Sequence, residues 1–149
     1  MFHQTLDVMK KIIKTAAPLL LLVLFAYAGL SKLFSLSDFR GELHNQSFPG
    51  WMAEILLYTL IPIELLTAGL LAFERTERWG LWLSLFLMSA FTGYIALVLL
   101  HFWKRVPCSC GGILKHMSWG AHLVFNVIFL VLALAALLLS EKADHTYST

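Results

Sequence analysis

Two cysteines separated by one residue are the side chains of this sequence best suited to chemistry. They are Cys108 and Cys110 in the segment RVPCSCGGIL, and the chain of 149 residues contains no other cysteine. Such a pair can exchange disulfides with a partner, bind a soft metal ion, or stay unreactive as a structural element. The spacing by itself leaves these three roles open.

The residues around the thiol pair favour redox chemistry. Cα atoms joined by a disulfide usually lie about 5.5–6 Å apart, so residues i and i+2 reach that distance only in a constrained backbone. Pro107 restrains the chain before the pair, and Gly111 and Gly112 permit unusual φ values after it. Ser118 is positioned to cap a following helix, whose N-terminus would favour a thiolate. Strained, exposed disulfides tend to be labile or catalytic, and we expect this one to be so.

Nearby histidines give a metal site as an alternative. His116 and His122 follow the pair, and Cys108, Cys110 and these two rings would offer soft ligands to copper or zinc. The spacing matches no ordinary zinc finger, and histidines are common at membrane interfaces. We therefore expect no metal here and keep a copper- or zinc-handling role as a third hypothesis.

The composition places the pair in a membrane protein. Apolar residues make up 59% of the chain and charged residues 13%, whereas soluble domains average about 45–50% and about 25%. Four apolar runs are each long enough to cross the bilayer as helices. We expect an all-α, single-domain, four-helix up-down bundle, with no nucleic-acid partner. The helices are expected at roughly residues 15–34, 53–73, 79–102 and 118–140, followed by a polar tail at 141–149.

Polar residues inside the runs form a second candidate group. Glu64 is an ionisable residue in the second run, and a charge at that depth is a functional hypothesis by default. Tyr94 and Asn126 fall at comparable depth, so we expect the Glu64 carboxyl to bond Tyr94, Asn126 or Tyr27. Lys32 is expected to extend toward the outer surface. A buried acid that only locks helix packing is the alternative role for Glu64.

Basic residues suggest the orientation. Six lie on the side of the termini and five on the other, and three of the six precede the first helix, which usually dominates. We expect cytoplasmic termini and a periplasmic cysteine loop in a bacterial inner membrane. An Ala26-Tyr27-Ala28 pattern is typical of signal cleavage, but the apolar run continues past it, and we expect this helix to be retained.

Several stretches together resemble a known family. They are AYAGLSKLFSLSDF, IPIELLTAGLLAF, FTGYIALVLL, and PCSCGGIL followed by MSWGAHLVFNVIFLVLAL. The chain resembles the MauE/DoxX-like redox-associated membrane proteins, particularly the MauE branch, over roughly residues 15–140. The resemblance implies a four-helix bundle of the inner membrane and a thioredoxin-like extracytoplasmic partner. It also implies that Cys108 and Cys110 are the redox pair and that Lys32 and Glu64 occupy recurring polar positions.

A relay to a quinone is not expected. The architecture is also similar to vitamin K epoxide reductase-like enzymes, which carry a Cys-x-x-Cys and a second pair, whereas this chain has one Cys-x-Cys. We therefore expect no required cofactor and keep a quinone only as an alternative that the similarity to these enzymes leaves open. The leading hypothesis is a membrane thiol–disulfide redox protein, with Cys108 and Cys110 as the exchanging residues. Pro107, Gly111, Gly112, Glu64, Lys32, Tyr94 and Asn126 would support them. The rival is a non-catalytic scaffold or subunit of a larger membrane complex.

Overall fold

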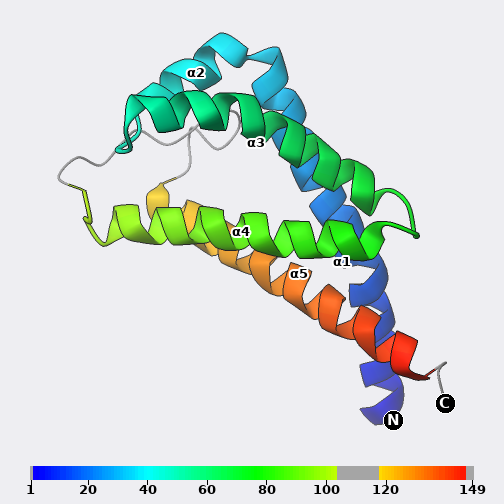
Figure 1. Ribbon diagram of the computed structural model, residues 1–149. Coiled ribbons are helices and arrows are strands. Elements are labelled where there is room, and N and C mark those ends of the chain that lie inside the picture. The colour runs from blue at the N-terminus through cyan, green and yellow to red at the C-terminus, as the bar shows by residue number, and fades with distance from the viewer. Residues whose placement is uncertain (1, 104–117, 147–149) are drawn as a thin grey trace.

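Helices make up nearly all of the structure. The computed structural model describes residues 2–103 and 118–146, with side chains described for residues 4–103 and 118–140. In chain order the helices are α1 (Phe2–Phe34), α2 (Leu36–His44), α3 (Gly50–Leu71), α4 (Glu77–Leu99) and α5 (Trp119–Thr146) (Figure 1). Both termini lie at one end, and α2 lies at the other.

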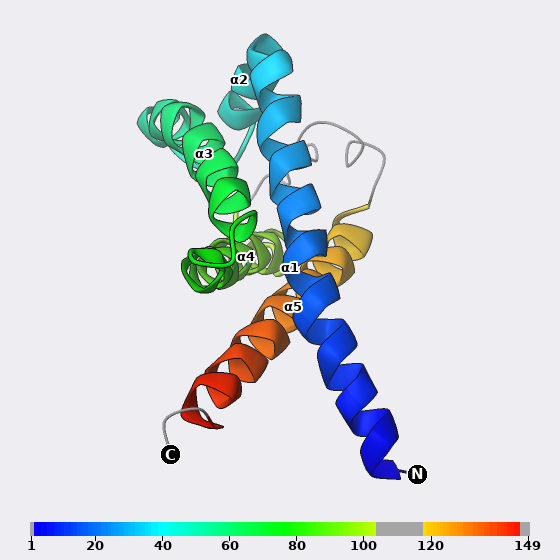
Figure 2. The same cartoon turned by 90° about the vertical axis from the view of Figure 1, so that its right-hand side faces the viewer.

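Four of the helices in the described ranges are long and apolar enough to cross a membrane. These candidate spans are Gln4–Phe34, Gly50–Leu71, Glu77–Leu99 and Trp119–Ser140. Successive spans run in opposite directions: α1 runs upward from the N-terminus (Figure 2), α3 runs toward the right of Figure 1, α4 returns to the left, and α5 runs to the lower right, where the termini lie. The expected all-α, four-span membrane architecture is confirmed.

The helices pack through small and aliphatic side chains along their shared faces. α1 packs on α3 and α5, and α4 packs on α3 and α5. Close approach of helices in lipid depends on small residues, because lipid supplies no hydrophobic force between helices. The core shows this pattern, with alanines between larger aliphatic and aromatic side chains: Ala17, Leu21, Phe25, Ala68, Leu71, Leu81, Leu87, Met88, Ala133, Ala136 and Leu137.

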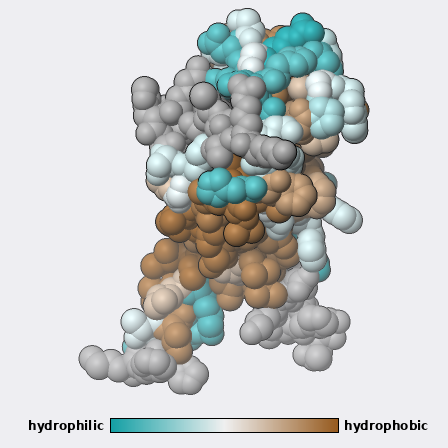
Figure 3. Space-filling view, turned by 90° about the vertical axis from the view of Figure 1, so that its left-hand side faces the viewer, coloured by the Kyte–Doolittle hydropathy of each residue, from teal (hydrophilic) through white to brown (hydrophobic). Residues whose placement is uncertain are grey.

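The outward faces carry large apolar side chains. Leu19 and Val23 of α1 and Val124, Ile128 and Val131 of α5 are all more than half exposed. Figure 3 shows an apolar body beneath a hydrophilic end where α2 lies. Inside the spans, hydroxyls bond carbonyls of their own helix: Ser84 Oγ donates to Gly80 O at 2.7 Å. The surface therefore suits lipid, and the helix polar groups are satisfied internally.

Three boundaries differ from the expected ones. No helix was expected between the first span, ending at residue 34, and the second, beginning at residue 53. This stretch contains α2, because Phe39 and Leu43 stand one turn apart and both are buried against α3 residues. α1 begins at Phe2, well before residue 15, and an ion pair between Asp7 and Lys10 lies on its polar first turns. α5 continues to Thr146, past residue 140. Hydropathy marks where a helix enters lipid. A helix continues beyond that point wherever its backbone hydrogen bonds can still form.

Candidate functional site

A membrane-embedded ion pair joins α1 to α3. The Lys32 ammonium donates to Glu64 Oε1 at 2.8 Å and to Glu64 Oε2 at 2.9 Å. The Glu64 side chain is only 2% exposed and that of Lys32 is 21% exposed. Lys32 Nζ also donates to Ala28 O at 3.3 Å, so three acceptors surround its three protons. The pair is thus hydrogen-bonded as fully as a buried ion pair requires.

Gly29 explains why the pair can form. A Cβ at Gly29 would lie 2.8 Å from Leu65 Cδ2 and 3.4 Å from Glu64 Cβ, so α1 and α3 touch closely here. Lys32 lies three residues further along α1, on the same face of the helix. Its side chain therefore starts beside Glu64, and the Phe39 ring of α2 covers the ammonium at 5.6 Å.

These contacts correct two expectations. In the described part of the chain the Glu64 carboxylate bonds Lys32, whereas Tyr94, Asn126 or Tyr27 was expected. Lys32 turns toward Glu64 instead of extending to the surface. The physical reason is that a buried carboxylate needs a charged or hydrogen-bonding partner, and the closest helix contact brings a lysine to it. Tyr27 is 43% exposed on α1.

Tyr94 belongs to a separate cluster at the α2 end. Its hydroxyl donates to Gln46 Oε1 at 2.7 Å. The centroid of the Tyr94 ring also lies 6.0 Å from that of Phe48 and 5.6 Å from that of Trp103. The segment after α2 and the segment after α4 thus meet on Tyr94. Gln46 was not anticipated, because a polar residue in an expected loop carries no sequence signal of burial.

The end of α4 directs Trp103 to this cluster. His101 has φ 53°, in the left-handed region that L-residues with large side chains rarely adopt. The amide of Phe102 donates to Leu97 O and that of His101 to Val98 O, both at 3.1 Å. These two bonds define a Schellman C-cap, with His101 in the position usually held by glycine. The chain therefore reverses sharply after α4.

α5 begins as the sequence predicted. Ser118 Oγ accepts from the backbone amide of Ala121 at 3.2 Å, as an N-cap does. Asn126, 4% exposed, faces the interior of the bundle, away from the lipid. His122 stands one turn earlier on the same face, and its buried Nδ1 has no hydrogen-bond partner among the residues that the structure describes. Neither side chain bonds Glu64. The polar residues that were expected to form one cluster therefore lie at separate positions along the bundle.

The cysteine segment lies outside the described residues. Cys108, Cys110, Pro107, Gly111, Gly112 and His116 all fall within residues 104–117. The elements on either side are described, since α4 ends at Leu99 and α5 begins at Trp119. Within the described ranges, no group of three or more His, Cys, Asp or Glu side chains is arranged to hold a metal ion. The roles expected for the thiol pair stay predictions.

Comparisons with known proteins identify the family. The model of the family described as methylamine utilisation protein MauE matches residues 9–139. This range contains all four candidate spans nearly complete, the Lys32–Glu64 pair and the Cys-x-Cys segment. No curated protein and no solved structure matches the chain. The chain is therefore a multi-pass membrane protein that belongs to the MauE family.

Proposed function

We propose that this protein is a membrane thiol–disulfide redox protein, in which Cys108 and Cys110 exchange with a thioredoxin-like partner outside the cytoplasm. The observation that carries the proposal is a lone Cys-x-Cys in the segment between α4 and α5. The flanking helix ends lie at the left of Figure 1, away from the termini, and Tyr94 near the end of α4 bonds Gln46, which follows α2. With cytoplasmic termini, that end faces an oxidising compartment, where such a pair can cycle.

The exchange needs two steps. A thiolate of the reduced pair attacks one sulfur of the partner's disulfide; that S–S bond breaks, a mixed disulfide forms, and the other partner sulfur leaves as a thiolate. The second cysteine then attacks the mixed disulfide. A Cys108–Cys110 disulfide and a partner dithiol result, so two electrons pass to the partner. The same steps run in reverse when the pair starts oxidised.

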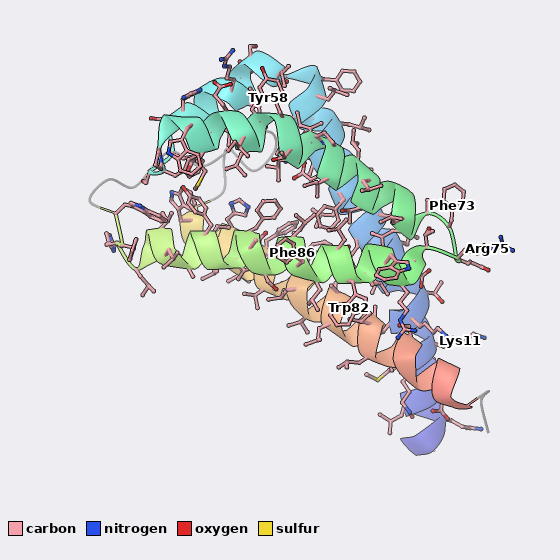
Figure 4. The ribbon with its side chains drawn as sticks, viewed as in Figure 1. Lys11, Tyr58, Phe73, Arg75, Trp82 and Phe86 are labelled. Atoms are coloured by element: carbon pink, nitrogen blue, oxygen red, sulfur yellow. The ribbon has the colours of Figure 1, made fainter. Side chains whose placement is uncertain are left out.

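Basic residues at the terminal end support this orientation. Lys11 of α1 and Arg75 of the α3–α4 turn both lie toward the end that holds the termini (Figure 4). Positive charge concentrates on the cytoplasmic side of membrane proteins. The proposal places the protein in a bacterial inner membrane with its cysteine segment in the periplasm.

Trapping of mixed disulfides tests the proposal. Single variants Cys108→Ser and Cys110→Ser are expressed in cells, quenched with acid and resolved without reductant. Removing the resolving cysteine should accumulate a mixed disulfide, and Ser109→Ala, which keeps both thiols, should behave as the wild type. If no variant captures a partner and the wild-type pair never changes redox state, the proposal is wrong. A stoichiometric partner that co-purifies equally with the double-serine variant would instead identify a scaffold.

A further inference from the structure

The first turns of α1 carry apolar and basic residues on opposite sides of the helix. An apolar residue is followed two positions later by a lysine in three places: Val8 and Lys10, Met9 and Lys11, and Ile12 and Lys14. With 3.6 residues in a turn, two positions take the chain to about the opposite side of a helix. The three apolar residues, here called the apolar stripe, therefore face away from the three lysines.

The apolar stripe is exposed along its whole length. Val8 is 56% exposed, Met9 53% and Ile12 58%. α1 first packs on the core further along the helix, through Ile13 and Ala17, and Figure 2 shows its N-terminal turns apart from the other helices. Large apolar side chains are unfavourable in water. The stripe therefore favours contact with an apolar phase, and the bilayer lies next to it.

The depth of these turns matches the headgroup layer of the bilayer. Lys14 directly precedes the apolar run of α1 and so marks the edge of the hydrocarbon. At 1.5 Å per residue, Lys11 stands about 4.5 Å and Lys10 about 6 Å further out. Headgroups add about 5–7 Å on each side of the bilayer. The three lysines, and Ile12 between them, thus lie at the level of the phosphates.

Neighbouring acidic residues distinguish the three lysines. Lys10 Nζ lies 3.3 Å from Asp7 Oδ1, and the charge of Lys14 acts on Glu77 of α4. Lys11 has no ion pair within the described ranges, and it lies toward the end that holds the termini (Figure 4). An ammonium without a carboxylate from its own chain has the most to gain from a phosphate. Lys11 should therefore contribute most to binding an anion.

We propose that the first turns of α1 dock on anionic phospholipid, with the apolar stripe at the boundary of headgroups and acyl chains and the lysines on phosphates. Helices with lysines opposite an apolar face bind such surfaces, and each basic residue near an anionic surface adds attraction. A second copy of the chain would cover the stripe but would bring no net negative charge to the lysines. Charge complementarity therefore favours lipid as the occupant.

Quenching of a fluorophore by nitroxide-labelled lipids tests the proposal. Ile12→Cys, in a Cys108→Ser/Cys110→Ser background, carries the fluorophore in bilayers of phosphatidylcholine and phosphatidylglycerol. In matched samples the nitroxide is on one lipid or on the other. Nitroxide on phosphatidylglycerol should quench about two- to fivefold more strongly, which is the range expected for about one lysine at an anionic surface. Raised salt should remove the difference, because it screens exposed charges.

Substitutions of the lysines separate charge from helix structure. Lys11→Gln should bring the two quenching values together. Lys11→Arg is the matched control and should preserve the difference, because it keeps the charge. Lys10→Gln should have a smaller effect than Lys11→Gln, since Asp7 already offsets Lys10. A loss of the difference in Lys11→Arg as well would show that charge is not the cause and would overturn the proposal.

Three further results would overturn the proposal. Equal quenching by both nitroxide lipids at low salt would mean that the helix has no preference for anionic lipid. Quenching by neither, with the emission of a fluorophore in water, would show that the stripe stays outside the bilayer. Protection of the fluorophore in cell membranes but not in bilayers of pure lipid would identify a protein as the occupant. The tested protein has no thiol pair, so these outcomes are independent of the proposed redox function.

Discussion

Lys32 and Glu64 form a two-pronged ion pair between α1 and α3, with Nζ 2.8 and 2.9 Å from the two carboxylate oxygens. The Glu64 side chain is almost fully buried, at 2% exposed, and the Lys32 side chain is 21% exposed. A buried ion pair adds little stability over an apolar replacement, but loss of one partner leaves an uncompensated charge. Replacement of a single member should therefore destabilise the protein more than replacement of both.

Removal of Lys32 should destabilise the protein strongly. Lys32→Ala leaves the Glu64 carboxyl without its partner, and we expect a loss of about 3–5 kcal/mol. The thermal midpoint in detergent measures the change. Lys32→Met combined with Glu64→Leu should recover most of the loss, because neither charge remains.

The exposed pair of α1 supplies the control for this comparison. Lys10 lies 3.3 Å from Asp7, and both side chains are more than half exposed. Lys10→Ala should leave the midpoint nearly unchanged, since exposed pairs contribute little. Equal effects of Lys10→Ala and Lys32→Ala would contradict the importance assigned to the buried pair.

Two glycines should resist substitution for reasons of space. A Cβ at Gly29 would meet Leu65 Cδ2 at 2.8 Å, and one at Gly80 would meet the backbone nitrogen of Leu71 at 2.9 Å. Gly29→Ala and Gly80→Ala should each cost about 1–3 kcal/mol. Gly80→Ala should cost more, because a side chain can rotate away and a backbone atom cannot.

Gly69 and Gly93 are the matched controls for these substitutions. A Cβ at either position meets nothing within 4 Å. Gly69→Ala and Gly93→Ala should therefore leave the thermal midpoint unchanged or raise it, because alanine favours a helix over glycine. Parallel losses at all four positions would show that helix contact is not the cause.

The backbone conformation of His101, in the turn after α4, predicts which substitutions this position tolerates. At φ 53° a β-branched residue is strained, and His101→Val should cost about 1–2 kcal/mol. His101→Gly should keep or raise the thermal midpoint, because glycine adopts this conformation freely. A tolerated valine would argue against the C-cap geometry.

The proposed orientation predicts which side each end of the bundle faces. After mild reduction, Cys108 and Cys110 should react with a membrane-impermeant maleimide in cells whose outer membrane has been permeabilised. A cysteine introduced as Arg75→Cys, in a Cys108→Ser/Cys110→Ser background, should react only after the inner membrane is broken. The opposite pattern would place the thiols in the reducing cytosol and remove the basis for the proposed exchange.

The spans could be predicted from the sequence because lipid imposes a simple rule. A helix crossing the core needs about 20 apolar residues, and four runs meet that need. The N-cap role of Ser118 could also be predicted, because its hydroxyl accepts a hydrogen bond from a backbone amide three residues later in the chain. α2 was missed because only the burial of Phe39 and Leu43 against α3 makes this short helix favourable.

The polar partners could not be predicted, because they depend on which helices touch. Depth in the membrane, the one criterion that the sequence offers, does not distinguish Tyr94 from Lys32 as a partner for Glu64. The choice is made by Gly29, where the close contact of α1 with α3 selects the lysine. Gln46 became a partner for Tyr94 only through the position of α2.

The length of α1 has a consequence for how far the protein extends beyond the membrane. Its 33 residues extend for about 50 Å at 1.5 Å per residue, whereas the hydrocarbon layer is about 30 Å thick. Tilting cannot absorb the difference, because Lys10, Lys11 and Lys14 resist entry into hydrocarbon. The first turns of α1 therefore extend beyond the hydrocarbon as a positively charged helix. A protein bound to these turns would be held at a fixed distance from the phosphate headgroups.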